Sequence, residues 1–206
     1  MGGFSYTWSR LEGNYSGLAS SDEYEPDGTG RNSPNVELFF DTWYLAFDKS
    51  LGLIDGPLAT DRPHVFKLYG SYSFPIGLTV GAMMQAMSGV PRTEYWIVDG
   101  NYMPYNRGNL GRTPSLFYAN FYAEYSLRLG RNRLAFSINI DNFLDANTTL
   151  VYFPYRTLYN LTVTEDQLLS GEWELETSGY VPNAMFNLPA IFYKPISARL
   201  GMRFSF

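Results

Sequence analysis

The sequence has 206 residues, no cysteine, one histidine and a formal net charge of −5, a length that suits one large domain or a piece of a larger protein. The lack of cysteine excludes a small disulfide-stapled scaffold and any cysteine-ligated metal site. No apolar run approaches the roughly 18 residues of a membrane-spanning helix, whereas the 17 Tyr and 15 Phe are an excess that aromatic girdles at two membrane interfaces would explain.

Six segments alternate apolar and polar residues with the period of two that places successive side chains on opposite faces of a β-strand. Each has roughly the 9–11 residues that a tilted strand needs to cross a bilayer. In chain order, we predict strands at residues 4–11, 64–74, 78–88, 116–128, 133–144 and 196–206.

Pairing of Phe74 with Leu78 across the short turn between the second and third strands would place Leu68 opposite Met84. Apolar side chains would then face apolar ones on every rung, and a slip of one residue would swap the faces.

The last strand has the clearest pattern. One face carries Arg199 and Arg203, which do not belong in a dry core. The other is wholly apolar and consists of Ile196, Ala198, Leu200, Met202, Phe204 and Phe206. An apolar outside and a hydrated inside are typical of membrane barrels. The sequence therefore predicts an all-β fold, an antiparallel transmembrane β-barrel segment with long extracellular loops.

The connections between the predicted strands are either very short or very long. Residues 75–77 and 130–132 form hairpin turns, whereas residues 12–63, 89–115 and 145–195 form long loops. This asymmetry is the rule for outer-membrane barrels, and it predicts that the short turns and the C-terminus face the periplasm. Within the loops, residues 164–167 predict a capping box before a short helix, and residues 37–49 predict a helical or extended segment.

Several short motifs occur in the order seen in one family. They are YTWSRLEGNYSGL (6–18), GPLATDRPH (56–64), SGVP (88–91), GRTPS (111–115) and NFLD (142–145), followed by a terminal Phe. Together they resemble the late strands and loops of TonB-dependent receptors of the Oar-like, carboxypeptidase-regulatory-domain group, over nearly the whole chain.

The resemblance implies that residues 1–206 are the C-terminal part of a barrel of about 22 strands, without its signal peptide, plug domain or TonB box. We expect the natural start to lie upstream, because residues 1–4 lack the features of a signal peptide. The implied function is part of an outer-membrane receptor that imports an unidentified substrate. Its implied partners are outer-membrane lipid and lipopolysaccharide, the rest of the barrel and the plug, the TonB complex through the plug, and the barrel-assembly machinery.

Three groups of residues are candidates for functional roles. The terminal residues resemble a barrel-assembly signal: Leu200, Met202, Phe204 and Phe206. Aromatic residues of the middle loop are possible ligand contacts: Tyr95, Trp96, Tyr102 and Tyr105. Strand charges are expected to face the lumen: Lys67, Glu124, Arg128, Arg133, Asp141, Arg199 and Arg203.

Two of these charges, Arg128 and Arg133, would lie opposite each other across a short turn. Like charges there need an acidic neighbour, which a plug could supply.

Catalysis has little support in the sequence. His64 stands at a predicted strand start and is expected to make a rim contact, and Asp61 and Arg62 are expected to make rim hydrogen bonds. No nucleophile has an activating context, so we predict no enzyme, cofactor or metal site.

No basic patch favours nucleic acid. The acidic residues of the first loop could bind calcium, but their spacing fits no known calcium loop: Asp22, Glu23, Glu25 and Asp27.

Two alternatives remain open from the sequence. Several copies could complete one self-assembling pore, or a soluble β-barrel could bind a small apolar ligand in its interior. The second alternative places Arg199 and Arg203 on the outside, around a core packed with Phe and Met.

Overall fold

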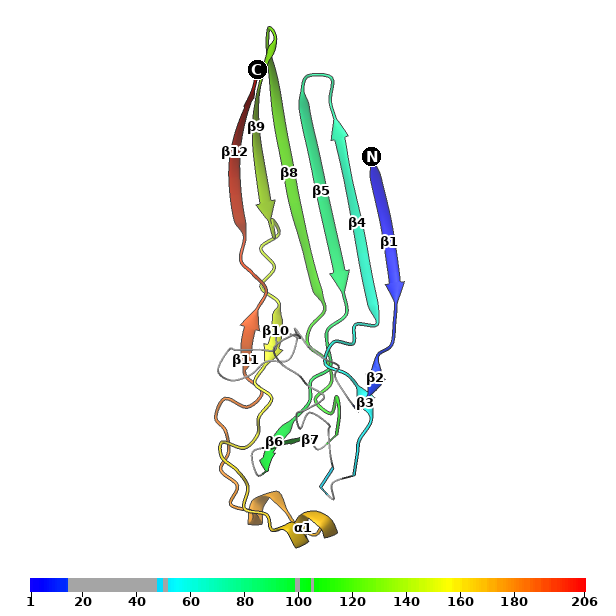
Figure 1. The fold of residues 1–206 in the computed structure, drawn as a ribbon, viewed down its shortest axis with the longest axis vertical. Coiled ribbons are helices and arrows are strands. Elements are labelled where there is room, and N and C mark those ends of the chain that lie inside the picture. Colours follow the sequence, from blue (N-terminus) through cyan, green and yellow to red (C-terminus); the bar gives the residue numbers. More distant parts are fainter. Residues whose placement is uncertain (15–47, 50–51, 99–100, 105) are drawn as a thin grey trace.

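A six-stranded antiparallel sheet dominates the structure (Figure 1). The computed structural model describes residues 1–14, 48–49, 52–98, 101–104 and 106–206, without the side chains of residues 101–104. The fold is nearly all β and consistent with a segment of a β-barrel. In their order across the sheet, the strands are β1 (Gly2–Trp8), β4 (His64–Ser73), β5 (Leu78–Met87), β8 (Leu116–Leu129), β9 (Asn132–Asp141) and β12 (Ser197–Ser205).

The structure confirms the existence of the six predicted strands and the predicted register, although the first strand, predicted at residues 4–11, lies at Gly2–Trp8. Leu68 lies opposite Met84 in the β4–β5 pair, and the backbone N–H of Phe74 donates to the carbonyl of Leu78 at 2.7 Å. The alternation of apolar and polar residues was enough to predict the register, because each strand has one nearly uniform apolar face. Only one register brings these apolar faces together on the same side of the sheet.

The predicted strand at residues 133–144 was too long at its C-terminal end. β9 stops at Asp141, because the next residue, Asn142, has a left-handed backbone with φ of 49°. That conformation turns the chain out of the sheet, and asparagine is one of the few residues other than glycine that adopts it readily.

Both tight turns lie at the same end of the sheet as the C-terminus, and the long connections gather at the other end (Figure 1). Gly77 in the β4–β5 turn has φ of 88°. A Cβ atom there would lie 2.5 Å from the carbonyl oxygen of Ser126 on β8. The turn therefore needs glycine both for its backbone conformation and for its contact with the next strand.

The sheet has an exposed apolar face. Leu200 and Met202 on β12 are 83% and 71% exposed, values that a core position never has. The cross-strand pairing places the following exposed apolar and aromatic residues together on what we call the apolar face: Phe4, Tyr6, Trp8, Phe66, Leu68, Tyr72, Met84, Phe117, Tyr125, Phe136, Leu200, Met202 and Phe204. A continuous apolar surface of this kind marks an interaction with lipid or protein.

The opposite side, which we call the polar face, carries the charged residues of the strands. The same pairing places these residues on it: Lys67, Gln85, Tyr118, Asn120, Tyr122, Glu124, Arg128, Arg133, Asn139, Asp141, Arg199 and Arg203.

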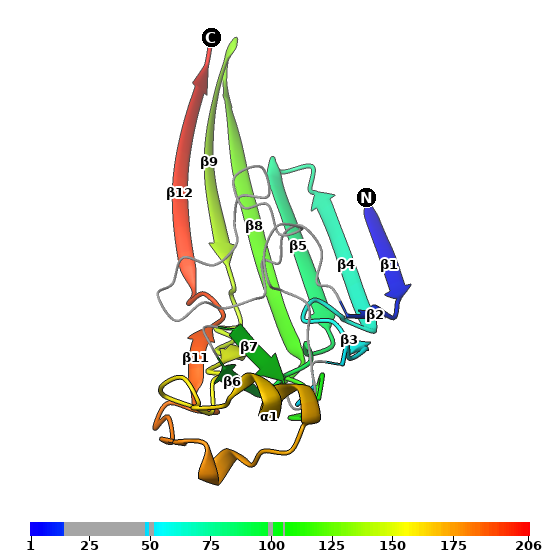
Figure 2. The ribbon, with the colours of Figure 1, turned by 60° about the horizontal axis from the view of Figure 1, so that its bottom comes forward.

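The long connections contain short strands that the sequence analysis did not predict. They form three two-stranded sheets: β2 (Glu12–Gly13) with β3 (Gly56–Pro57), β6 (Tyr95–Val98) with β7 (Asn101–Pro104), and β10 (Thr149–Tyr152) with β11 (Pro189–Phe192). Segments of two to four residues are too short for alternation to reveal them. Figure 2, in which the loop end comes forward, shows β6, β7, β11 and helix α1 (Glu165–Ser170) all beyond the loop end of the six-stranded sheet.

A small hydrophobic core lies in these loops. Trp96 and Trp173 pack edge to face with ring centroids 5.7 Å apart, together with Val98, Leu161 and Leu175. Leu175 belongs to a short 3₁₀ helix, η2 (Leu175–Thr177). The loop region therefore has a dry interior of its own.

Helix α1 confirms the predicted capping box. The hydroxyl of Thr164 accepts from the backbone N–H of Gln167, and the side chain of Gln167 accepts from the backbone N–H of Thr164. Of the segment predicted at residues 37–49, only residues 48 and 49 lie within the described part. Among the described residues, no helix is both long and apolar enough to cross a bilayer.

Replacing Thr164 with alanine is expected to destabilise α1 by about 1 kcal/mol, because the first turn loses its side-chain acceptor. Amide hydrogen exchange at Leu168 and Gly171, whose N–H groups bond within the helix, should accelerate. Thr164→Ser keeps the hydroxyl and should behave like the natural sequence. Equal exchange rates in all three proteins would show that the cap does not stabilise the helix.

Candidate functional site

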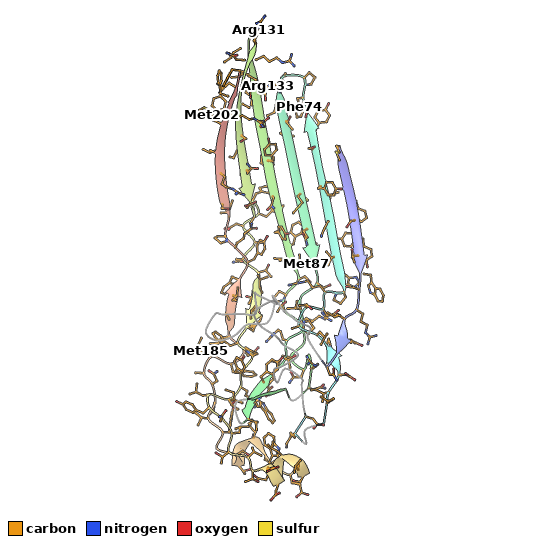
Figure 3. All side chains as sticks on the ribbon, viewed as in Figure 1. Phe74, Met87, Arg131, Arg133, Met185 and Met202 are labelled. Atoms are coloured by element: carbon orange, nitrogen blue, oxygen red, sulfur yellow. The ribbon has the colours of Figure 1, made fainter. Side chains whose placement is uncertain are left out.

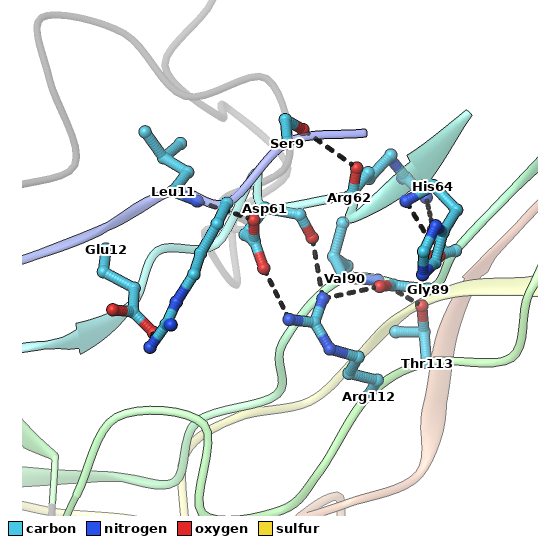
Figure 4. A network of polar contacts seen from close by, with 12 residues as sticks. Ser9, Leu11, Glu12, Asp61, Arg62, His64, Gly89, Val90, Arg112 and Thr113 are labelled. Carbon is cyan, nitrogen blue, oxygen red and sulfur yellow. Dashed lines mark hydrogen bonds and ion pairs between the residues drawn. The ribbon is translucent and has the colours of Figure 1, made fainter. Parts of the chain in front are cut away.

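A network of polar contacts joins the strand ends at the loop side of the sheet (Figure 4). At its centre, a carboxylate oxygen of Asp61 lies 2.5 Å from a guanidinium nitrogen of Arg112, and the Asp61 side chain is only 2% exposed. The second carboxylate oxygen accepts the backbone N–H of Leu11 at 2.8 Å. A buried carboxylate needs such partners, so Asp61 fixes the chain that leaves β1 against the chains that approach β4 and β8.

The guanidinium of Arg112 also donates to two backbone carbonyls, those of Asp61 at 2.9 Å and Gly89 at 3.0 Å. Arg62 donates to the carbonyl of Ser88 at 2.8 Å. The predicted rim hydrogen bonds of Asp61 and Arg62 are therefore confirmed. Sequence reasoning missed Arg112, because it is 51 residues from Asp61 and nothing local identifies it as the partner.

The motifs SGVP and GRTPS pair with each other beside this network. Val90 donates its N–H to the Thr113 hydroxyl at 3.0 Å, and Thr113 donates its N–H to the Val90 carbonyl at 2.9 Å. A Cβ atom on Gly89 would lie 1.7 Å from the carbonyl oxygen of Thr113. Glycine is required here by the close approach of the two backbones.

A second group of hydrogen bonds fixes the ends of β9 and β12. The fully buried Asn142 donates its amide to the carbonyls of Ala146 and Lys194 at 3.0 and 2.7 Å. Its backbone N–H donates to the side chain of Asn120 on β8 at 2.9 Å. The asparagine of the motif NFLD thus has a structural role, because it makes hydrogen bonds to three separate segments of the chain.

His64 makes the rim contact expected from the sequence. Its Nδ1 atom lies 2.9 Å from the hydroxyl of Tyr6, and the two rings stack at a centroid distance of 6.1 Å.

Two ion pairs cross the strands on the polar face. Arg203 on β12 donates to Glu124 on β8 at 2.9 Å, and Arg199 on β12 donates to Asp141 on β9 at 3.2 Å. Lys194, just before β12, is 3.5 Å from the same Asp141 carboxylate. These contacts show which predicted lumen-facing charges lie together. That the polar face borders a lumen stays a prediction.

A shallow hollow lies on the sheet between Tyr69, Met83, Asn120, Tyr122 and Asp141. Its lining combines phenol, amide and carboxylate groups with apolar ones, among them Phe121 and Ala82.

Towards the loops, Tyr118 stacks on Tyr193 with ring centroids 4.8 Å apart. Burial, and then the neighbouring phenol of Tyr118, raise the pKa of Tyr193 to about 12, so Tyr193 is neutral at ordinary pH.

The predicted assembly-signal residues all lie at one edge of the sheet. Leu200, Met202 and Phe204 belong to β12, share the apolar face and are exposed, as is the terminal Phe206. Their role in barrel assembly stays a prediction.

Of the four loop aromatics, the structure describes the side chains of Tyr95 and Trp96 only, and these two have different surroundings. Trp96 is buried, with its indole N–H donated to Glu94 at 2.7 Å, so it supports the loop core and offers little surface to a ligand. Tyr95 packs against Tyr155 at 6.1 Å. The side chain of Tyr102 and the whole of Tyr105 lie outside the described part of the structure.

Over the ranges that the structure describes, no three His, Asp or Glu side chains come together as metal ligands. The acidic candidates for calcium fall outside those ranges: Asp22, Glu23, Glu25 and Asp27.

Comparison with known proteins finds one curated relative and neither a matching family model nor a matching solved structure. The chain is similar to the TonB-dependent transporter Oar of Myxococcus xanthus, with 29% identity over 230 residues. The match covers 98% of this chain and 20% of that protein, so the chain spans about a fifth of its relative's length. This similarity supports a relation to TonB-dependent receptors without assigning the chain to one group of them, and the relative is a transporter rather than an enzyme.

Proposed function

We propose that this chain forms part of the wall of an outer-membrane, TonB-dependent transporter that imports an unidentified substrate. The observation that carries the proposal is the contrast between the two faces of the sheet, with Leu200 and Met202 largely exposed on one and the Glu124–Arg203 ion pair on the other. Hydrocarbon tails would cover the apolar face, and a hydrated lumen would border the polar one.

The edges of the sheet support a larger barrel. In the described part of the chain, β1 and β12 each pair with one strand only. Unpaired backbone groups in a bilayer cost several kcal/mol each, so further strands are needed at both edges. We propose that these strands belong to the rest of the transporter barrel, whose lumen holds a plug through which TonB acts. The short turns would face the periplasm, and the loops with Trp96 and Trp173 the exterior.

Fluorophores attached to single cysteines test this placement, because the natural chain contains no cysteine. The protein is produced in its host membrane with either Leu200→Cys or Ser137→Cys, which lie on opposite faces of neighbouring strands. Brominated lipid should quench the fluorophore at position 200, and aqueous iodide the one at position 137. Cell fractionation should place both proteins in the outer membrane. Iodide quenching at position 200, or recovery of the protein as a soluble species, would refute the proposal.

A further inference from the structure

The shallow hollow of the polar face has a volume of about 400 Å³ and lies where small residues interrupt rows of large ones. Ser71 on β4 pairs with Gly81 on β5, and Tyr69 stands on the next polar rung. Figure 3 marks the two ends of this strand pair with Phe74, beside the turn, and Met87, at the loop side, and the hollow lies between them. Its volume is in the range of sites that hold small molecules.

Gly81 keeps the hollow open, although the fold does not need a glycine there. Its backbone is not left-handed. A Cβ atom on it would lie 3.4 Å or more from its nearest neighbours, which is ordinary van der Waals contact. Glycine inside a strand costs stability, so a larger residue would suit β5 better. A strand glycine that neither backbone nor packing requires is typical of a place where another molecule approaches the sheet closely.

Two tyrosines flank the hollow, and contacts within the sheet hold both rings in place. The ring of Tyr69 extends over Gly3 on β1, where an added Cβ atom would lie 2.6 Å from the Cζ atom of the tyrosine. The hydroxyl of Tyr122 on β8 donates to Glu124 at 3.0 Å. The face of an aromatic ring is negative and attracts the C–H groups of a ligand. Rings that are already fixed lose little further freedom when a ligand binds.

The charged groups at the hollow already have partners. Asp141 is the only charged side chain that lines it among the described residues. Its carboxylate lies 3.2 Å from the guanidinium of Arg199 and 3.5 Å from the ammonium of Lys194. The amino group of Met1 donates to the carbonyl of Ser71 at 2.8 Å. The hollow therefore favours a neutral ligand over an ion.

Two amides provide hydrogen bonds for a neutral ligand. Asn120 uses its side-chain oxygen to accept the backbone N–H of Asn142, which leaves its NH₂ group as a donor. Asn139 lies on the same rung as Tyr122, and in the described part of the chain its side chain has no hydrogen-bond partner. The hollow thus offers both hydrogen-bonding groups and apolar contacts.

A sugar ring matches this combination, because its C–H groups form apolar faces and its hydroxyl groups both donate and accept hydrogen bonds at its edge. A peptide backbone has the hydrogen-bonding groups but no such ring. We infer that the hollow binds one ring of a neutral oligosaccharide. The inference rests on the proposed function and names the substrate class, because it requires the polar face to border a hydrated lumen.

Saturation-transfer NMR on the full-length protein, purified in a detergent without a sugar headgroup, tests the inference. The probes are maltotriose, cellotriose and chitotriose, and we expect saturation of ring C–H protons in at least one of them. Gly81→Ile fills the hollow and should raise the apparent dissociation constant at least about tenfold, because the sugar ring loses its place between the tyrosines. Ser137→Ile adds the same side chain to the polar face outside the hollow and should leave the constant unchanged.

Asn139→Leu provides a second variant, because it removes an amide from an exposed position without filling the hollow. It should weaken binding as well, and electrophoresis of unheated samples checks that each variant folds. Three results would overturn the inference: no saturation of any of the three sugars, binding that neither Gly81→Ile nor Asn139→Leu weakens, or saturation of the neutral peptide tetra-alanine that Gly81→Ile abolishes. The fluorophores at positions 137 and 200 test the membrane placement separately. Their expected quenching, without sugar binding, would refute this inference and leave the proposed function intact.

Discussion

Replacing Arg112 with leucine is expected to destabilise the protein by about 3–5 kcal/mol, because it leaves a buried carboxylate without its counter-ion. Asp61 is 2% exposed, and among the described residues its carboxylate would keep the N–H of Leu11 as its one hydrogen-bond partner. The carbonyls of Asp61 and Gly89 would lose their donor as well. The effect should appear as a lower midpoint of urea unfolding in detergent micelles, followed by tryptophan fluorescence.

Arg10→Ala provides the matched control. Arg10 also forms an ion pair, with Glu12 at 2.6 Å, but the two side chains are 68% and 44% exposed. Exposed pairs contribute little to stability, since water screens them. The two variants thus remove the same kind of contact and differ in burial. If Arg112→Leu lowered the midpoint no more than Arg10→Ala does, the network around Asp61 would not be what fixes the strand ends.

Replacing Leu200 with arginine is expected to destabilise the folded, membrane-inserted protein by about 2–4 kcal/mol if this position lies near the middle of the bilayer. Leu200 stands opposite Ile138 on the apolar face and is 83% exposed. In contact with water, an arginine at so exposed a position would change stability little. The size of the effect therefore reports whether lipid or water covers this face. Reversible unfolding from lipid vesicles, measured by fluorescence, gives the free energy directly.

Ser137→Arg places the same charge on the polar face of the sheet, on the neighbouring strand β9. Ser137 lies between Glu124 on β8 and Gly201 on β12, so the new side chain would stand on the polar face beside a carboxylate, which Arg203 already contacts, and beside a glycine. We expect a change below about 1 kcal/mol, as for other exposed ion pairs. Equal costs for the two arginines would contradict the assignment of one face to lipid and the other to water.

The six long strands could be predicted from the sequence because their apolar and polar residues alternate over seven to fourteen residues. The same regularity set the register: Leu68 meets Met84 as expected. The prediction failed where a single backbone conformation decides the outcome. Asn142 ends β9 through its positive φ, and no apolar pattern shows that an asparagine will turn left-handed.

The contacts of the candidate site were harder to predict than the strands. Asp61 was recognised as a rim residue, but its partner Arg112 comes from another loop, and only the assembled sheet brings the two together. Trp96 was expected among possible ligand contacts, yet it packs against Trp173, which lies far along the chain in the last loop. Long-range pairings of this kind depend on tertiary structure, which local composition does not encode.

The hydrogen bonds of Asp61 and Asn142 have a consequence for how this protein can change. Both residues fasten the chain where it leaves the sheet, Asp61 by its contact with Leu11 and Asn142 by its contact with Asn120. Beyond these fastenings, the loops can gain, lose or exchange residues without altering the alignment of the strands, since a longer surface loop adds only a small entropic cost. The loop surface could therefore change in sequence and length over evolution while the six-stranded sheet stays the same.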